Sequence, residues 1–321
     1  MSPKVPGSNG LKIFSGTANP ELAKNIAKSL KVPLGDIMVT RFSEGEIRVK
    51  INEDVRGRDI FIIQPTCPPV NDNVMELLIM LDAFWRASAR RVTAVLPYYG
   101  YARQDRKDQP RVPITAKLIA NIVTEAGADR ALTMDLHAQQ IQGFFDIPVD
   151  HLYAFPVIAN YFRKKKLKNL TVVSPDVGGI KMARAYAKGL NADLAIVDKR
   201  RSGPNEVEAM NLIGEVRGKT VLVPDDMIAT GGSLVEAVNA LVKFGAKDIY
   251  ASCTHAVLSG NAVEKLQKSV LKEVVVTDTI PIPPEKRIGK ITVLPVAPLF
   301  GEAIMRIHNE ESISSLFNDV I

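Results

Sequence analysis

The sequence has few cysteines and no long apolar segment. Cys67 and Cys253 are the only two cysteines in 321 residues, and no CxxC pair occurs. This excludes a disulfide framework and a cysteine-based zinc site. No apolar run approaches the length of about 18 residues that a membrane helix needs, and no apolar leader follows Met1. We therefore expect a cytoplasmic protein that does not associate with membranes.

The sequence also lacks a strong excess of either charge. Lys and Arg total 41 against 35 acidic residues, a formal net charge of +6. The basic residues are not gathered as they are in nucleic-acid-binding domains. The mild positive charge suits small anionic substrates, and we expect no nucleic-acid partner.

Short apolar strands alternate with amphipathic helices along the whole chain. Strands are predicted at residues 91–97, 170–174 and 221–223, and helices at 20–30, 71–88, 177–188 and 298–308. Such alternation predicts an α/β protein with mainly parallel sheets covered by helices on both faces. The length suits two domains. We place them at residues 1–150 and 151–303, with a C-terminal helix at about 304–321 that packs on the first.

The most informative stretch is residues 219–235, KTVLVPDDMIATGGSLV. Gly231 and Gly232 lack a Cβ, so the backbone N–H groups around them can turn toward an anion. The helix expected to follow, with Ser233 as its N-cap, adds unpaired N–H groups, and the Thr230 and Ser233 hydroxyls add donors. A monophosphate fits this turn.

Two carboxylates precede the same turn. Asp225 and Asp226 stand at the end of the predicted strand, where they can accept hydrogen bonds from vicinal hydroxyls. A diol at one end and a phosphate at the other describe a pentose 5-phosphate. The alternative is an ordinary strand–helix turn, because Asp, Gly and Ser are common turn residues.

Two further strand ends carry residues that can serve a metal or a phosphate. His137 lies in the polar run DLHAQQIQGFFDIPVD, and Asp176 lies in SPDVGG, a turn with two glycines. Asp176 can reach magnesium directly or through water. For both, a purely structural role is an equally good interpretation from the residues alone.

Three more clusters are rich in charge or aromatic side chains. They are FSEGE at 42–46, YYGYARQDRK at 98–107 and DKRR at 198–201. The first suits a purine and ribose contact, and the arginines of the second can pair with phosphates. The third is expected on a loop, where its cations can stabilise charge on a transferring group or simply face solvent.

Together, these motifs closely resemble those of the ribose-phosphate pyrophosphokinases, or PRPP synthetases, in order and spacing. The long run that contains His137 resembles the family signature, whereas the DDMIATGGS turn is shared with phosphoribosyltransferases. The resemblance covers nearly the whole chain. It implies two phosphoribosyltransferase-like α/β domains, the substrates ATP and ribose 5-phosphate, Mg²⁺ as cofactor, and a homo-oligomer, usually a hexamer built from dimers.

The resemblance also implies a role for individual residues. Those implied for ATP are Phe42, Glu44, Gly45, Glu46, Arg103 and Gln104. Those implied for ribose 5-phosphate are Arg201, Asp225, Asp226, Ala229, Thr230, Gly231, Gly232 and Ser233. His137 and Asp176 are implied for magnesium, and Lys199 and Arg201 for stabilising the transition state.

One position departs from the family pattern. Many members carry an acid where this chain has Ala229, so a carboxylate near the sugar is lost. This keeps two alternatives open: a phosphoribosyltransferase that consumes PRPP, and a non-catalytic homologue that regulates an active partner. Retention of Lys199, Arg201, His137 and Asp176 favours the enzyme.

Overall fold

The computed structural model describes residues 10–200 and 209–317, which form two compact units. Among these residues, unit 1 comprises those up to Tyr153 together with Thr279–Pro281 and Val296–Phe317. Unit 2 comprises Ala154–Asp278 and Ile282–Pro295. The predicted boundary between residues 150 and 151 stays a prediction, whereas residues 296–303, which were assigned to the second domain, lie in unit 1.

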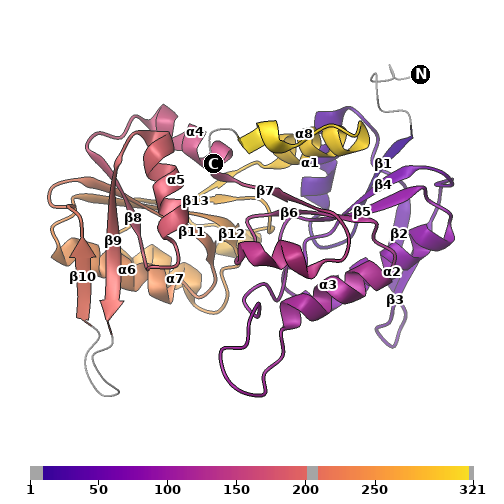
Figure 1. Ribbon diagram of the computed structural model, residues 1–321, viewed down its shortest axis with the longest axis horizontal. Coiled ribbons are helices and arrows are strands. Elements are labelled where there is room, and N and C mark those ends of the chain that lie inside the picture. The colour runs from indigo at the N-terminus through magenta and orange to yellow at the C-terminus, as the bar shows by residue number, and fades with distance from the viewer. Residues whose placement is uncertain (1–9, 201–208, 318–321) are drawn as a thin grey trace. The chain divides into compact units, whose positions relative to one another are not determined.

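Unit 1 is built on a parallel sheet in the order β1-β4-β5-β6-β7, with a separate antiparallel hairpin. The α1 and α8 helices cover one face of the sheet, and α2 and α3 cover the other (Figure 1). The strands are β1 Leu11–Ser15, β2 Ile37–Arg41, β3 Ile47–Ile51, β4 Asp59–Ile63, β5 Arg91–Leu96, β6 Arg130–Met134 and β7 Val149–Leu152. The helices are α1 Pro20–Leu30, α2 Val70–Arg86, α3 Thr115–Glu125 and α8 Ala297–His308, with short 3₁₀ turns η1 Gln139–Phe144 and η3 Ser314–Phe317.

Unit 2 is built on a larger sheet in the order β10-β9-β8-β11-β12-β13-β14, parallel except for β10. The α4 and α5 helices lie on one face, and α6 and α7 on the other (Figure 1). The strands are β8 Leu170–Ser174, β9 Asp193–Arg200, β10 Ala209–Ile213, β11 Thr220–Ile228, β12 Asp248–Ala256, β13 Glu273–Thr277 and β14 Ile291–Leu294. The helices are α4 Phe155–Lys165, α5 Ile180–Leu190, α6 Gly232–Lys243 and α7 Ala262–Lys268, with a 3₁₀ turn η2 Pro284–Lys286.

The core of each unit lies where its apolar strands meet the helices. Every residue of β4 is buried, and in unit 1 the rings of Phe14 and Phe84 pack with centroids 4.5 Å apart. In unit 2 the three residues Val221–Val223 are completely buried. Strands buried on both faces read as continuous apolar runs, which is why the sequence predicted them well.

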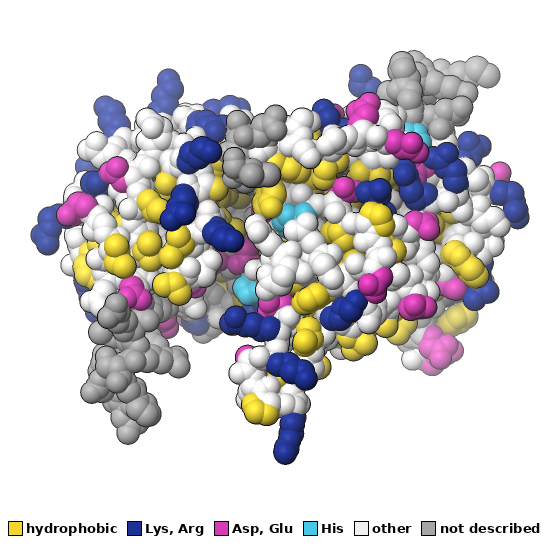
Figure 2. Space-filling model, in the orientation of Figure 1, with side chains coloured by type: hydrophobic (Ala, Val, Ile, Leu, Met, Phe, Trp, Pro, Cys, Tyr) yellow, Lys and Arg dark blue, Asp and Glu magenta, His cyan; other side chains and the backbone are white. Residues whose placement is uncertain are grey.

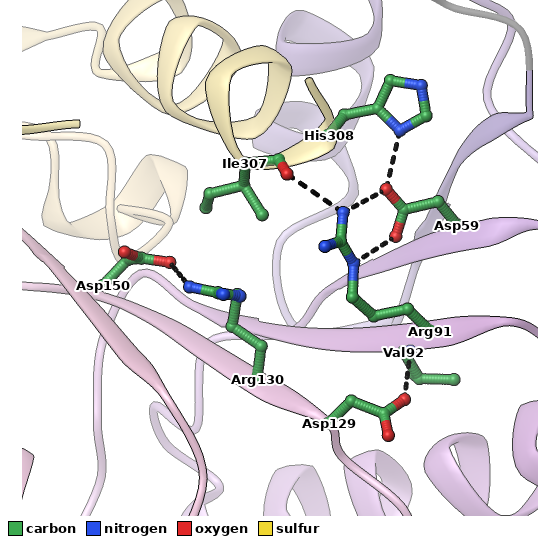
Figure 3. Close-up of polar contacts among 8 residues, drawn as sticks. All are labelled: Asp59, Arg91, Val92, Asp129, Arg130, Asp150, Ile307 and His308. Atoms are coloured by element: carbon green, nitrogen blue, oxygen red, sulfur yellow. Dashed lines mark hydrogen bonds and ion pairs between the residues drawn. The ribbon is translucent and has the colours of Figure 1, made fainter. Parts of the chain in front are cut away.

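The local pattern predicts a closing helix at residues 298–308, and α8, Ala297–His308, confirms it. The expectation of a C-terminal helix at about 304–321 was wrong, because α8 ends at His308 and the described residues after it form only the 3₁₀ turn η3. The α8 helix packs against α1. A buried carboxylate joins the end of the helix to the sheet: Asp59 accepts hydrogen bonds from Arg91 Nε at 2.8 Å and from Arg91 Nη2 at 2.6 Å (Figure 3). His308 Nδ1 lies 2.6 Å from the same carboxylate, and Arg91 also donates to the Ile307 carbonyl at 3.0 Å (Figure 3).

Lys and Arg side chains are scattered among acidic and uncharged ones on the face that Figure 2 shows, and form no stripe there. The absence of a nucleic-acid partner stays a prediction. Within residues 10–200 and 209–317, every helix is too short or too polar to cross a membrane.

Candidate active site

The stretch predicted to bind a sugar phosphate forms the end of β11 and the start of α6 in unit 2. Gly231 is buried and has φ +70°, a backbone conformation that glycine adopts without strain. The helix begins at Gly232, so the prediction that Ser233 is the N-cap was wrong. Ser233 lies in the first turn and is exposed, as is Thr230. No side chain in the described part of the chain caps this helix, which leaves its first N–H groups available to an anion.

The two carboxylates lie within the strand rather than after it. The prediction that the strand ends at Val223 was wrong, because β11 continues to Ile228. The backbone N–H of Asp226 donates to Asp225 Oδ1 at 2.8 Å. Burial and the neighbouring charges of Asp226 and Asp176 raise the pKa of the Asp225 carboxyl. The Asp225 carboxyl therefore keeps its proton to a higher pH than an ordinary aspartate, beside Asp226 and Asp176.

The buried thiol of Cys253 lies beside Asp225. Cys253 stands opposite Asp225 in the parallel pair of β11 and β12. Burial, with a further contribution from Asp225, raises the pKa of the Cys253 thiol well above its ordinary value. Burial therefore disfavours the thiolate, which is the form that acts as a nucleophile or metal ligand.

Asp176 organises the turn between β8 and α5. Its Oδ1 accepts from the Gly179 backbone N–H at 2.9 Å, and its carbonyl accepts from the Ser174 hydroxyl at 2.6 Å. The helix starts at Ile180, three residues later than the predicted Val177. Asp176 itself is exposed, so the sharp turn presents its carboxylate to solvent.

The basic cluster is only partly described. Lys199 belongs to β9, whose backbone pairs with β10 at Met210. Its expected position on a loop was therefore wrong, because β9 continues to Arg200. Arg201 lies outside the described residues.

In unit 1, the loop after β5 carries Arg103 and Gln104, both exposed. Most of the residues before them are buried, namely Tyr98, Tyr99, Gly100 and Ala102, and the Tyr99 hydroxyl donates to the Ala116 carbonyl of α3 at 2.8 Å. The Thr115 hydroxyl donates to Gln104 Oε1 at 2.5 Å. A rigid base therefore carries two exposed polar side chains, a common arrangement in binding loops.

The FSEGE motif forms the tip of the β2–β3 hairpin. Phe42 N–H donates to the Glu46 carbonyl at 2.9 Å, and Gly45 takes φ +97° to close the turn. Phe42 is 45% exposed, with the Arg48 guanidinium 5.6 Å from its ring centroid. Glu44 and Glu46 are exposed, so the tip presents an aromatic ring and two carboxylates to a partner or ligand.

His137 follows β6, at the edge of the unit 1 sheet where the Arg103–Gln104 loop follows the parallel strand β5. It is exposed, whereas Asp135 two residues earlier is buried with φ +38°. From the following turn η1, the Gln140 side chain donates to Asp105 Oδ2 at 2.7 Å. This contact, between residues 35 apart in the chain, joins the His137 run to the Arg103–Gln104 loop, and sequence reasoning missed it.

The carboxylate and imidazole side chains described above suit a metal ion that is also bound by substrate phosphates. The described residues contain no group of three or more His, Cys, Asp or Glu side chains placed to bind a metal together. Mg²⁺ commonly uses only one or two protein carboxylates and completes its shell with water and substrate phosphates. Burial, with the charges of Asp226 and Asp176, raises the pKa of the Asp225 carboxyl, and a cation bound beside it would lower that pKa.

Comparisons with known proteins identify the family. A sequence model of the N-terminal domain of ribose phosphate pyrophosphokinase matches residues 11–127, and one of a phosphoribosyl synthetase-associated domain matches residues 200–318. The ribose-phosphate pyrophosphokinase of Caldanaerobacter subterraneus is 58% identical over 97% of this chain and 98% of that protein. The one from Corynebacterium ammoniagenes is 56% identical over 99% of this chain and 100% of that protein.

The chain belongs to the ribose-phosphate pyrophosphokinase family. The crystal structure of phosphoribosylpyrophosphate synthetase from Mycobacterium smegmatis matches with a TM-score of 0.89 and 43% identity, over 94% of this chain and 99% of that chain. This confirms the predicted α/β fold with phosphoribosyltransferase-like domains and the predicted enzyme class, a diphosphotransferase of PRPP synthesis. The family uses a metal ion. A phosphoribosyltransferase and a non-catalytic homologue are not favoured.

Proposed function

We propose that unit 2 binds ribose 5-phosphate at the end of β11 and the start of α6. Asp225 and Asp226 accept hydrogen bonds from the sugar diol, and the turn Ala229–Ser233 binds the 5-phosphate. The observation that carries this proposal is the buried left-handed Gly231 at the uncapped start of α6, three residues after a strand that holds two adjacent carboxylates. The backbone N–H groups of that turn match the phosphate, and the carboxylates match the hydroxyls.

ATP is assigned to the exposed groups of unit 1. Arg103 and Gln104 contact the nucleotide from the loop after β5, and the hairpin tip with Phe42, Glu44, Gly45 and Glu46 supplies the remaining contacts. Exposure of that tip suits the base of ATP in a neighbouring subunit, with the ring stacking on the purine and the carboxylates accepting from the amino group and ribose.

The reaction transfers the β,γ-diphosphate of ATP to O1 of ribose 5-phosphate and gives PRPP and AMP. The sugar O1 attacks the β-phosphorus, the bond from that phosphorus to the α,β-bridging oxygen breaks, and the O1 proton passes to solvent. The bridging oxygen leaves with AMP. Binding of both substrates in line replaces a bimolecular encounter, and positioning and charge neutralisation supply most of the rate.

Magnesium is the proposed metal. His137 and Asp176 are each assigned to it on the chemistry of their side chains, and the bound ion neutralises phosphate charge. Ala229 leaves the phosphate turn intact because its role there needs only backbone groups. Magnesium removal by chelation abolishes turnover on this account, and full activity in the presence of excess chelator would contradict it.

Lys199 and Arg201 stabilise the charge that develops on the transferring diphosphate. We expect Lys199→Ala and Arg201→Ala each to lower kcat by about 10²–10³-fold, the range for loss of one preorganised charge-stabilising group. Steady-state kinetics with saturating ATP and ribose 5-phosphate measures this. Turnover equal to that of the wild type in both variants would remove the assigned role.

The protein is proposed to work in the cytoplasm as a homo-oligomer, a hexamer built from dimers. The support is the family resemblance and the exposed hairpin tip, which needs a second surface to contact. Light scattering of the purified protein tests the assembly, and a mass equal to that of one 35.1 kDa chain would contradict it.

A further inference from the structure

A buried threonine holds the base of the Arg103–Gln104 loop. Thr66 follows β4, and the loop Tyr98–Gln104 follows β5, which is the neighbouring strand in the parallel sheet. The two chain segments therefore leave the same edge of the sheet side by side. Thr66 is 1% exposed, and Tyr98, Tyr99 and Gly100 are all buried.

Three hydrogen bonds join Thr66 to this loop. The Thr66 hydroxyl accepts from the Gly100 backbone N–H at 2.6 Å and donates to the Tyr98 carbonyl at 3.2 Å. The Thr66 N–H donates to that carbonyl as well, at 2.9 Å. The hydroxyl thus uses both its donor and its acceptor capacity, and it is the partner of the buried Gly100 N–H.

The packing at Gly100 shows how closely the two segments approach. A Cβ at this position would lie 2.5 Å from the Thr66 carbonyl oxygen and 3.1 Å from its hydroxyl. Only glycine fits, and it brings its N–H within reach of the Thr66 hydroxyl. Three residues further on, the chain emerges and exposes Arg103 and Gln104.

We propose that Thr66 is a positioning residue for ATP: through Gly100 it fixes the path of the loop that carries Arg103 and Gln104. This inference rests on the proposed ATP site. Without the hydroxyl, the buried Gly100 N–H has no partner, and the loop spends part of its time in other conformations. The apparent affinity for ATP then falls in proportion to the fraction of protein molecules whose loop is in the binding conformation.

The test is Thr66→Val, which keeps the size of the side chain and removes the hydroxyl. We expect KM for ATP to rise about tenfold, which corresponds to about 1.4 kcal/mol. We expect kcat and KM for ribose 5-phosphate to stay within about threefold, because the other site is in unit 2. Thr66→Ser restores the hydroxyl and returns KM for ATP to within about threefold of the wild-type value.

Thr93→Val is the matched control. Thr93 lies on β5 of the same sheet, is completely buried, and has no hydrogen-bond partner for its hydroxyl among the described residues. Valine at position 93 removes a hydroxyl that makes no hydrogen bond to a described residue. We therefore expect KM for ATP and KM for ribose 5-phosphate to stay at the wild-type level. Should Thr66→Val fail to fold, Thr66→Ala removes the same hydroxyl without placing a methyl group against the Gly100 N–H, and it must raise KM for ATP alone.

Two outcomes overturn the inference. One is an unchanged KM for ATP in Thr66→Val or, if that variant does not fold, in Thr66→Ala. The other is an equal rise of KM for both substrates, which marks general structural damage. Arg103→Ala separates this inference from the proposed ATP site. If Arg103→Ala leaves KM for ATP unchanged, the proposed ATP site is wrong. If Arg103→Ala raises KM for ATP but Thr66→Val does not, only the role of Thr66 is refuted.

Discussion

At the scale of the residue, the left-handed glycine before α6 decides whether the phosphate turn can form. Gly231 has φ +70° and is buried, and among the described residues outside its own turn the nearest atoms to a Cβ built there belong to Ala262, at 3.7 Å. The conformation, not space, is thus what requires glycine. We expect Gly231→Ala to cost about 1 kcal/mol of unfolding free energy and to raise KM for ribose 5-phosphate about tenfold or more, as steady-state kinetics would show.

Gly218→Ala is the control for this prediction. Gly218 also has a left-handed φ, +69°, and a Cβ there meets nothing within 4 Å. It lies just before β11, away from the phosphate turn. An equal loss of stability with no change in KM would confirm that the effect of Gly231 is specific to the turn, whereas an equal rise in KM in both variants would contradict it.

The Asp225 carboxylate is placed for function at a cost in stability. Its folded-state pKa is raised, so the folded state holds a proton that the unfolded state releases, and stability falls as pH rises through this range. Asp225→Asn removes the penalty. We expect a Tm gain of about 2–8 °C above pH 8, for a relief on the order of 1–2 kcal/mol, and no gain below about pH 4.

The same variant loses function. An amide cannot replace the carboxylate as a double acceptor for the sugar diol, so we expect ribose 5-phosphate to bind at least about tenfold more weakly. Calorimetric titration and thermal unfolding over pH 4–9 measure both effects. A lower Tm than the wild type at pH 9 would show that the carboxylate is stabilised by its neighbours, against this account.

At the scale of the element, the attachment of α8 depends on one buried carboxylate. Asp59 is 1% exposed, and it holds both Arg91 of β5 and His308 at the end of the helix (Figure 3). Asp59→Asn removes the carboxylate that both Arg91 and His308 contact. We expect a loss of about 3 kcal/mol of unfolding free energy, measured by denaturant titration.

Asp82→Asn supplies the comparison. Asp82 pairs with Arg86 one turn along α2, but this pair is on the exposed surface, and such pairs contribute little to stability. We expect no measurable change in the unfolding midpoint. Equal destabilisation by the two substitutions would show that burial does not set the strength of the Asp59 contacts.

The elements also show what sequence can and cannot predict. The start of α1 was predicted correctly from Asn19-Pro20, because the Asn19 side chain accepts from the Leu22 N–H at 3.2 Å, a local contact. The β7 and β10 strands were missed, since each is a short edge strand whose extended form depends on its neighbour in the sheet. Ser233 was misread as a cap because residue type alone does not reveal that Gly231 is the N-cap and that the helix begins at Gly232.

At the scale of the whole molecule, the motifs could be found in the sequence, but most of their contacts could not. The order of strands, helices and polar clusters predicts the fold and the reaction. Contacts such as Gln140 with Asp105, or Thr66 with Gly100, join residues far apart in the chain and leave no local pattern. Parallel strands predict only that such loops share an edge of the sheet.

The most direct test of the whole account is product analysis. The purified protein is incubated with ATP, ribose 5-phosphate and Mg²⁺, with and without inorganic phosphate, and the nucleotides are separated by ion exchange. The account predicts AMP in equal amount with PRPP, which also shows that Ala229 is tolerated. ADP in place of AMP would mean transfer of a single phosphoryl group and would contradict it, as would the absence of turnover in both buffers.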